Sequence, residues 1–409
     1  MTLAESALQS GVRLLNAGGR GLKRFGSDLP SLDERSLRRA AERRAGLGDY
    51  GDWPIAEPLA RLLESYEREA HLTTLGRITV RELVVSLLEN LLLLERERAA
   101  TPAIESARIA APVFVVGLPR TGTTLLHGLL AEDPANRAPA TWEVMYPATP
   151  AEPAAIERAR RRTAVRLGWA NRLAPEFKRI HPIAPDLPQE CIAITAQAFA
   201  SIQFHTTHSV PSYQDWLEQD SQDLGYAFHR RLLQHLEARA PGRRWVLKAP
   251  GHLFGLDALL RQYPDARIVQ THRDPLKVIA SMASLATVLK RAFSTRADPH
   301  EIGRDWTERW AGALERFLAI RDRARPEQFL DVDYESLERA PLAAVERIYS
   351  FLGWPLTPEA RAAMERFLAA NPKNKHGKHR YTLEEYGLDR DTWLGRFRPY
   401  CERFSIPVD

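Results

Sequence analysis

The residues with the clearest chemical potential stand in the segment GLPRTGTT, Gly117–Thr124, which we call the anion loop. It follows a short apolar run, VFVVG, that predicts a buried strand, and it precedes a run that predicts a helix. A glycine-bearing turn in this position exposes backbone N–H groups where the helix dipole adds about half a positive charge. Arg120 adds a fixed cation, and Thr121, Thr123 and Thr124 add hydroxyl donors. The segment therefore predicts a site for a phosphate-like anion.

The anion loop departs from the loop of nucleotide hydrolases. Their motif, G-x-x-x-x-G-K-[ST], uses its lysine on the β- and γ-phosphates and the next hydroxyl on Mg²⁺. Gly117 and Gly122 match the two glycines, but Thr123 occupies the lysine position. This difference argues against ATP or GTP chemistry.

A second stretch, RIVQTHRDPLKVIASM, predicts another strand followed by a helix. Asp274 can cap that helix and Pro275 suits its first turn. Arg273 then stands at the strand end, and Ser281 falls on nearly the same helix face as Asp274. Ligands of an open parallel sheet bind at the carboxyl ends of its strands. Arg273 and Ser281 therefore predict a second anion pocket, and two such pockets in one crevice favour a ligand with two separated phosphate groups.

The triplet His272-Arg273-Asp274 also resembles the catalytic triplet of protein kinases. That motif requires an asparagine five residues after the aspartate, where this chain has Ile279. We therefore exclude the protein-kinase interpretation.

Together these motifs resemble those of the sulfotransferases that use 3′-phosphoadenosine-5′-phosphosulfate (PAPS). The run GLPRTGTTLL is similar to the 5′-phosphosulfate loop of the protein-tyrosine sulfotransferases and of a broad bacterial branch with P-R-[ST]-G-[ST]-T. Cytosolic steroid and phenol sulfotransferases have a lysine where Arg120 stands. The family's 3′-phosphate motif is an arginine followed eight positions later by a serine, which is the spacing of Arg273 and Ser281. The resemblance runs in order over residues 113–388 and is specific only at short segments.

The resemblance implies which residues bind PAPS. The 5′-phosphosulfate would be held by Arg120, Thr121, Gly122, Thr123 and Thr124, and the 3′-phosphate by Arg273 and Ser281. Tyr334, at the end of the predicted strand QFLDVDY, would support the adenosine region. The basic segment Asn374–Leu388 stands where family members close a loop over the 3′-phosphate. Lys378 is the candidate there, with Lys375 and Arg380, and a solvated run of charges is the alternative for each of them.

Sulfuryl transfer requires cations near the leaving oxygen and a base near the acceptor hydroxyl, and it requires no metal. Lys248 ends the predicted strand WVLK and would supply the cation beside Arg120, like the lysine at this place in the tyrosine sulfotransferases. Glu143, in ATWEV, matches their catalytic glutamate, although it lies two residues further from the loop than expected. His252, in KAPGHL, is the other contender for the base. The expected catalytic residues are Glu143, Lys248 and Arg120.

The acceptor side carries a weaker signal. A region rich in helical pattern contains polar and aromatic residues that could form the roof of an acceptor pocket, although an aromatic stripe is more often core. These residues are His181, Gln189, Glu190, Phe199, Phe204, His205, Tyr213, Trp216 and Phe228. By resemblance to bacterial members with N-terminal helices, the acceptor would be a small or lipid-like alcohol.

The order of strands and helices around these residues predicts an α/β fold. In this fold a P-loop-type, mostly parallel sheet is flanked by helices. Residues 1–110 predict a helical N-terminal extension, and residues 111–409 a sulfotransferase-like α/β domain with a helical acceptor-side insertion at 151–240. The expected strands are Val113–Gly117, Trp245–Lys248, Arg267–His272 and Gln328–Tyr334. The expected helices are Leu3–Leu15, Ser31–Arg44, Ile55–Glu69, Val80–Arg98, Thr123–Ala131, His252–Gln262, Pro275–Leu289 and Leu342–Leu352.

Composition narrows the function further. The 57 Lys and Arg against 52 Asp and Glu give a formal net charge of +5, which suits a small anionic ligand and argues against a nucleic-acid binder. Two cysteines exclude a disulfide scaffold. We expect a cytoplasmic protein without a signal peptide or transmembrane segment, and a homodimer is compatible with the helices.

The sequence thus predicts a metal-independent, PAPS-dependent sulfotransferase that acts on a hydroxyl. Two alternatives remain open at this point: a P-loop small-molecule kinase, and a non-catalytic protein that binds adenosine bisphosphate.

Overall fold

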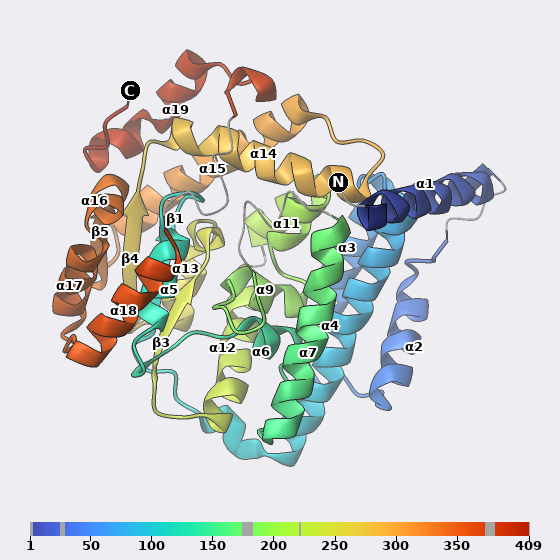
Figure 1. Cartoon of the computed structure of the whole chain (residues 1–409), viewed down its shortest axis with the longest axis horizontal. Helices are drawn as coiled ribbons and strands as arrows, with labels where there is room; N and C mark the ends of the chain where they lie inside the picture. Colours follow the sequence, from blue (N-terminus) through green and yellow to red (C-terminus); the bar gives the residue numbers. More distant parts are fainter. Residues whose placement is uncertain (1–2, 25–28, 174–182, 221, 373–380, 409) are drawn as a thin grey trace.

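The computed structural model of this 409-residue chain describes residues 3–24, 29–173, 183–220, 222–372 and 381–408. Within them, a five-stranded sheet has the order β2-β3-β1-β4-β5 (Figure 1). The strands are β1 (Val113–Gly117), β2 (Asn136–Arg137), β3 (Arg244–Lys248), β4 (Arg267–His272) and β5 (Phe329–Asp333). All pairings between these strands are parallel. Their carboxyl ends therefore meet at one edge of the sheet.

Alternate residues of the central strand face opposite sides of the sheet, as the two-residue period of a strand requires. Val113 and Val115 of β1 lie in one hydrophobic cluster, and Phe114 and Val116 lie in the other. The first side is covered by α5 (Thr123–Ala131), α17 (Pro341–Leu352) and α18 (Pro358–Ala370) (Figure 1). The other side is covered by α12 (Gln222–Arg239), α13 (Leu256–Gln262), α14 (Pro275–Phe293) and α15 (Pro299–Arg321).

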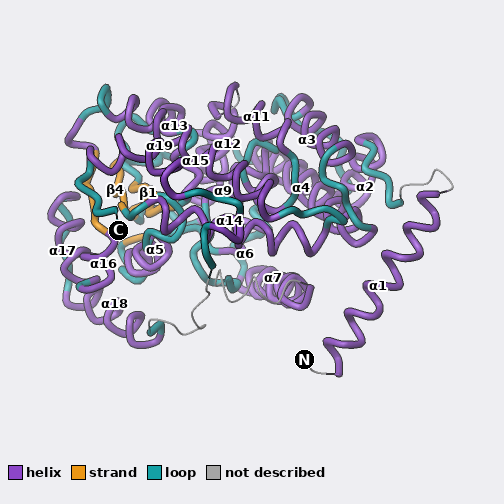
Figure 2. Tube along the Cα trace, turned by 90° about the horizontal axis from the view of Figure 1, so that it is seen from above, coloured by secondary structure: helices purple, strands orange, loops and turns teal. Residues whose placement is uncertain are grey.

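The described part of residues 1–110 is helical. It forms α1 (Leu3–Arg24), α2 (Glu34–Ala45), α3 (Ala56–Arg68), α4 (Thr74–Ala100) and the short 3-10 helix η1 (Pro102–Ser106). Buried residues of α4, among them Val84 and Leu88, belong to the same hydrophobic cluster as Phe114 of the sheet. In contrast, α1 projects away from the body of the molecule (Figure 2). The boundary at residue 110 therefore marks a change of secondary structure within one continuous core.

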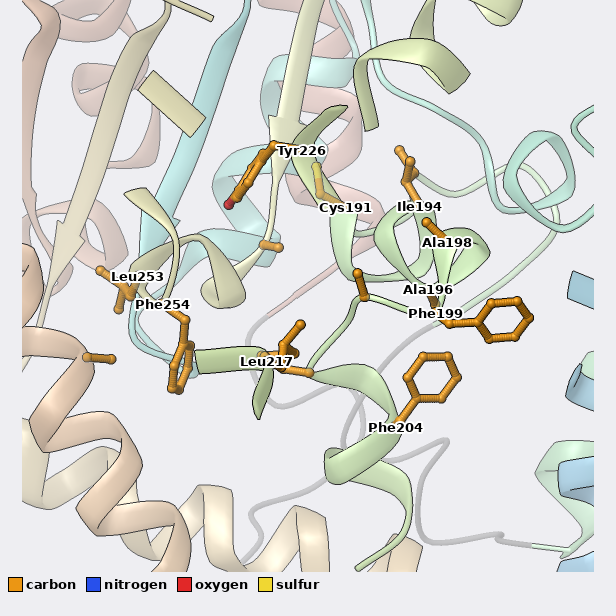
Figure 3. Close-up of a cluster of buried hydrophobic side chains, with 14 of the residues drawn as sticks. Cys191, Ile194, Ala196, Ala198, Phe199, Phe204, Leu217, Tyr226, Leu253 and Phe254 are labelled. Carbon is orange, nitrogen blue, oxygen red and sulfur yellow. The ribbon is translucent and has the colours of Figure 1, made fainter. Parts of the chain in front are cut away.

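The segment between β2 and β3 is also helical where it is described. It contains α6 (Thr141–Met145), α7 (Pro153–Leu173), α9 (Cys191–Thr195), η2 (Ala196–Ala198), α10 (Gln203–Thr207), α11 (Pro211–Asp220) and α12. Buried side chains of α9 and η2 pack near Phe204 and Tyr226 (Figure 3). This cluster fixes α9, whose first turn follows Glu190.

The prediction of the fold class is confirmed, and β1, α5 and β4 have the predicted bounds. The sequence analysis missed β2, which is only two residues long, and it ended α1 too early at Leu15. It also missed α15, η4 (Pro326–Gln328), α16 (Tyr334–Arg339), α18, η5 (Glu384–Tyr386) and α19 (Arg390–Arg403). No helix in the described residues combines the length and the apolar character needed to cross a membrane.

Candidate active site

The anion loop connects β1 to α5 at the carboxyl edge of the sheet. Gly122, the N-cap of α5, has a φ of 84°, a conformation that favours glycine. A Cβ atom at this position would lie 2.8 Å from Cδ2 of Leu337. Arg120 also has a positive φ, 65°, which is strained for a residue with a side chain. The loop is thus a tight turn at a helix N-terminus, the arrangement that binds phosphate groups.

The three threonines of the anion loop have different surroundings. The buried Thr121 hydroxyl donates to the carbonyl oxygen of Leu118 at 2.6 Å and lies 2.6 Å from Oγ1 of Thr271. It therefore ties the loop to β4, and Thr121 does not line the adjoining cavity, contrary to its predicted contact with PAPS. Thr123 and Thr124 do line that cavity.

A buried ion pair lies beside the anion loop. Lys248, the last residue of β3, is only 2% exposed. Its Nζ donates to Oγ1 of Thr124 at 3.3 Å and pairs with the carboxylate of Glu190. A lysine buried this deeply requires a carboxylate partner. Since Glu190 and Thr124 both line the cavity, the pair connects the anion loop to the inserted helical region.

Arg273 follows β4 and lies on the other side of the anion loop. Its Nη1 donates to the carbonyl oxygen of Arg120 at 2.8 Å, and its guanidinium lies 4.2 Å from the ring centroid of Tyr334. Arg120, Arg273 and Tyr334 all line the same cavity. The two arginines of the predicted anion pockets are therefore brought together. Ser281 is buried on α14 and is not part of the lining, so its predicted contact with the 3′-phosphate finds no support in this arrangement.

Glu143, the predicted base, is held by hydrogen bonds that stabilise the local structure. One carboxylate oxygen accepts from Nη2 of the buried Arg137 at 3.0 Å, and the other accepts from the backbone N–H of Ala140 at 2.9 Å. The second bond caps α6. Glu143 does not line the cavity, whereas the neighbouring Val144 does. This geometry argues against Glu143 as the base, because a base must reach the acceptor hydroxyl.

His252, the other contender, is also placed in the core. It lies in η3 (Pro250–Leu253), and its Nδ1 is 2.6 Å from the hydroxyl of Tyr226. Burial and the nearby His229 lower the pKa of His252 well below its usual 6.5. It lines a separate hollow of about 20 Å³ and does not reach the main cavity. A neutral histidine bonded in this way supports the packing of η3.

The main cavity has a volume of about 730 Å³, within the range of small-molecule sites. At one end it is lined by the anion loop, Arg273 and Tyr334, and Glu190 also contributes to its wall. Apolar side chains of α4, α7, α9 and α14 also line it, namely Leu83, Leu87, Leu167, Ile192, Met282 and Leu285, together with a smaller polar part that includes Asn90, Arg166 and Gln197. The cavity therefore combines an anion-binding end with a largely apolar compartment.

The residues predicted on the acceptor side divide into two groups. Gln189 and Glu190 line the cavity. Five others are buried in the core, namely Phe199, Phe204, His205, Tyr213 and Phe228, and Trp216 packs against that core. His181, Lys375, Lys378 and Arg380 lie outside the described residues.

The sequence analysis did not identify Glu190 as a candidate base, although one signal was available. A lysine that ends a buried strand needs an acidic partner. Glu190 was the acidic residue among those predicted on the acceptor side. In the described part of the chain, no three or more His, Cys, Asp and Glu side chains are grouped so that they could hold a metal ion.

Comparisons with known proteins identify the family of this chain. A family model described as "Sulfotransferase family" matches residues 112–358. The omega-hydroxy-beta-dihydromenaquinone-9 sulfotransferase Stf3 of Mycobacterium bovis is 24% identical over 296 residues, 69% of this chain and 73% of that protein. The crystal structure of the sulfotransferase STF1 from Mycobacterium tuberculosis H37Rv has a TM-score of 0.80 and 36% identity, covering 90% of this chain and 98% of that one. That of STF9 from Mycobacterium avium has a TM-score of 0.81 and 28% identity, covering 93% and 99%.

Proposed function

Because the chain belongs to the sulfotransferase family, we propose that it moves the sulfuryl group of PAPS to the hydroxyl of a lipid-like alcohol. The observation that carries the proposal is that one cavity combines an anion-binding end, an apolar compartment and a carboxylate, Glu190, in its wall. The buried partner of Glu190, Lys248, lies next to the anion loop.

The anion-binding end has the features that PAPS requires. Gly122 lets the turn pack against Leu337, where a Cβ atom would conflict, and the start of α5 offers backbone N–H groups to the 5′-phosphosulfate. Arg273 provides the positive charge for the 3′-phosphate. Tyr334, which lies under that guanidinium, offers a ring surface near the adenosine. Arg120 adds the second cation of this end.

Glu190 and Lys248 carry out the main steps of the transfer. Glu190 accepts the proton of the acceptor hydroxyl as its oxygen attacks sulfur. The new bond joins that oxygen to sulfur, and the bond between sulfur and the phosphate oxygen breaks. Lys248 and Arg120 stabilise the negative charge that develops on the leaving phosphate. Thr124, which accepts a hydrogen bond from Lys248, orients the ammonium group.

The apolar lining supports an acceptor with a hydrocarbon body. Leu83 and Leu87 of α4 and Leu167 of α7 lie in the wall of the cavity. Burial of hydrocarbon in such a compartment contributes about 25 cal/mol for each Å² removed from water. The Stf3 relative is named for a hydroxylated menaquinone derivative, an acceptor of this physical kind.

The deciding experiment measures transfer of ³⁵S from labelled PAPS to a series of primary alcohols of increasing chain length. We expect labelled sulfate esters, with kcat/KM rising as the chain lengthens, since each buried CH₂ adds about 0.8 kcal/mol of binding. A K248A variant serves as the control for transfer that does not depend on the site. Transfer to none of the alcohols despite tight binding of 3′,5′-bisphosphoadenosine would contradict the proposal, as would phosphate transfer from ATP in the same assay.

A further inference from the structure

Helix α7 is strongly basic, and exposed apolar and arginine side chains form a stripe along one side of it. Val165 is 61% exposed and Trp169 is 52% exposed, whereas Ala155, Ala159 and Thr163 of the same helix are buried. Steps of four and three residues place Arg158, Arg162, Val165 and Trp169 along one side of the helix. The stripe therefore presents a ring, an aliphatic side chain and guanidinium groups to the same surroundings.

The charge of α7 is markedly one-sided. The helix has six arginines and one glutamate, Glu157, and that glutamate is paired with Arg161 at 2.9 Å. Within the described part of the chain, neither Arg158 nor Arg162 has a carboxylate within ion-pair distance. The guanidinium of Arg162 instead lies 4.3 Å from the ring centroid of Tyr146. Among the described residues, the stripe thus retains positive charge that no carboxylate neutralises.

Arginines of α7 also line a second hollow, of about 560 Å³, beside the main cavity. Four arginines, Arg44, Arg158, Arg162 and Arg166, and two glutamates, Glu82 and Glu89, form part of its wall. Glu82 pairs with Arg44 at 2.6 Å and with Arg166 at 3.7 Å, so the hollow keeps an excess of positive charge. The second hollow and the main cavity share four lining residues, namely Ser86, Asn90, Met145 and Arg166. A basic hollow therefore adjoins the apolar compartment, and α7 contributes to both.

We propose that α7 docks on a membrane surface rich in anionic phospholipids, with a lipid phosphate in the second hollow. The arginines attract the headgroups, while Trp169 and Val165 enter the boundary between headgroups and acyl chains, where tryptophan is favoured. This rests on the proposed function, since an acceptor dissolved in a membrane would reach the apolar compartment along α7. α1, whose Leu14 is exposed, projects on the same side as α7 (Figure 2) and can join the contact.

The test is binding of the full chain to vesicles, with neither PAPS nor acceptor present. We expect co-sedimentation with phosphatidylcholine vesicles containing about one third phosphatidylglycerol, and at least about tenfold weaker binding to phosphatidylcholine alone. The double variant R158E/R162E should lose at least about tenfold in affinity for the anionic vesicles. The matched control is R398E/R403E, which makes the same change of charge at exposed positions of α19.

A second measurement follows tryptophan fluorescence in the wild-type protein and in a W169F variant. Brominated acyl chains should quench tryptophan fluorescence, and the W169F variant should lose most of that quenching. Equal binding to both kinds of vesicle, no binding, or equal effects of the two double variants would overturn the inference. So would a concentration-dependent dimer that protects Trp169 without any vesicle binding. The vesicle assay measures no sulfuryl transfer, so it tests the docking surface independently of the proposed function. If the protein binds anionic vesicles but sulfates no alcohol in the assay with labelled PAPS, the proposed function is contradicted and the docking surface is still supported.

Discussion

At the scale of single residues, the site is organised around the contact between Lys248 and Glu190. The lysine ends β3 and the glutamate precedes α9, so each is fixed by a different element. Because both groups are largely buried, removal of one charge would leave the other unpaired, which is strongly unfavourable in this environment. Loss of either side chain is therefore expected to affect the other as well as the reaction.

Substitutions of Glu190 and of Glu143 distinguish which of the two carboxylates serves as the base. We expect E190Q to lower kcat by about 10²–10⁴, the contribution of a general base, with a smaller change in KM for PAPS. E143Q should leave kcat within about threefold of wild type and lower the free energy of unfolding by about 1–3 kcal/mol, since Arg137 loses a charged partner. Steady-state kinetics and urea denaturation of both variants distinguish the roles. A greater loss of kcat in E143Q than in E190Q would restore Glu143 as the base.

Substitution of Lys248 tests the stabilisation of the leaving group. We expect K248A to lower kcat by about 10²–10³, the effect of removing one preorganised electrostatic donor. Calorimetry with 3′,5′-bisphosphoadenosine should show a much smaller change in affinity, because Arg273 and the anion loop remain. An unchanged kcat would remove Lys248 from the mechanism.

At the scale of elements, the donor end depends on the turn between β1 and α5. The turn has two positive φ values in three residues, at Arg120 and Gly122, and it passes close to α16. Such a backbone is maintained only by the elements around it, including the bond from Thr121 to Leu118. The geometry of the anion loop is therefore a property of several elements together.

A glycine substitution tests this turn. G122A should lower the free energy of unfolding by about 1–3 kcal/mol and weaken 3′,5′-bisphosphoadenosine binding at least about tenfold, since the new Cβ conflicts with Leu337. The matched control is G353A, at the end of α17, where φ is also positive, 67°, and nothing lies within 4 Å of the added atom. We expect G353A to lower stability by about 1 kcal/mol without changing the dissociation constant. Calorimetry and thermal denaturation check both; equal binding by G122A and wild type would disprove the tight-turn argument.

The elements of the donor end could be predicted because each depends on local sequence. An apolar β-branched run, a glycine turn and an apolar helix follow one another without interruption from β1 to α5. The choice between Glu143 and Glu190 could not be made in this way. Each glutamate stands at the start of a short helix, and only the path of the inserted region brings Glu190 to Lys248, 58 residues further along. Similarly, β2 is too short to leave a periodic signal.

At the scale of the whole molecule, one hydrophobic core joins the N-terminal helices, the inserted helices and one face of the sheet. This core also contains charged groups. Lys290 of α14 is 1% exposed, near Asp305, whose carboxylate is bonded by His205 at 2.6 Å and Arg309 at 2.9 Å. The lysine is thus a charge buried inside the packing of α14 against α15.

Burial lowers the pKa of the Lys290 ammonium group to about 8, whereas an unfolded chain would have about 10.4. Below pH 8 both states are protonated, and the folded state bears the full penalty of burying the charge. That penalty is relieved as pH rises from about 8 to about 10.4. We expect K290M to be more stable than wild type by about 1–3 kcal/mol at pH 7, and the difference to shrink through this pH range. Urea denaturation at a series of pH values measures it; a constant difference would contradict the assignment.

The two ends of the main cavity come from different kinds of structure. Ends of neighbouring parallel strands and one tight turn form the anion-binding end, whereas α4, α7 and α9 provide most of the hydrocarbon wall. Amino-acid changes along those helices can therefore reshape the apolar compartment while the anion loop keeps its geometry. Substitutions on these helices alone can thus change which molecule fits the apolar compartment. Proteins with this architecture can therefore differ widely in the molecule they accept while keeping the same anion-binding turn.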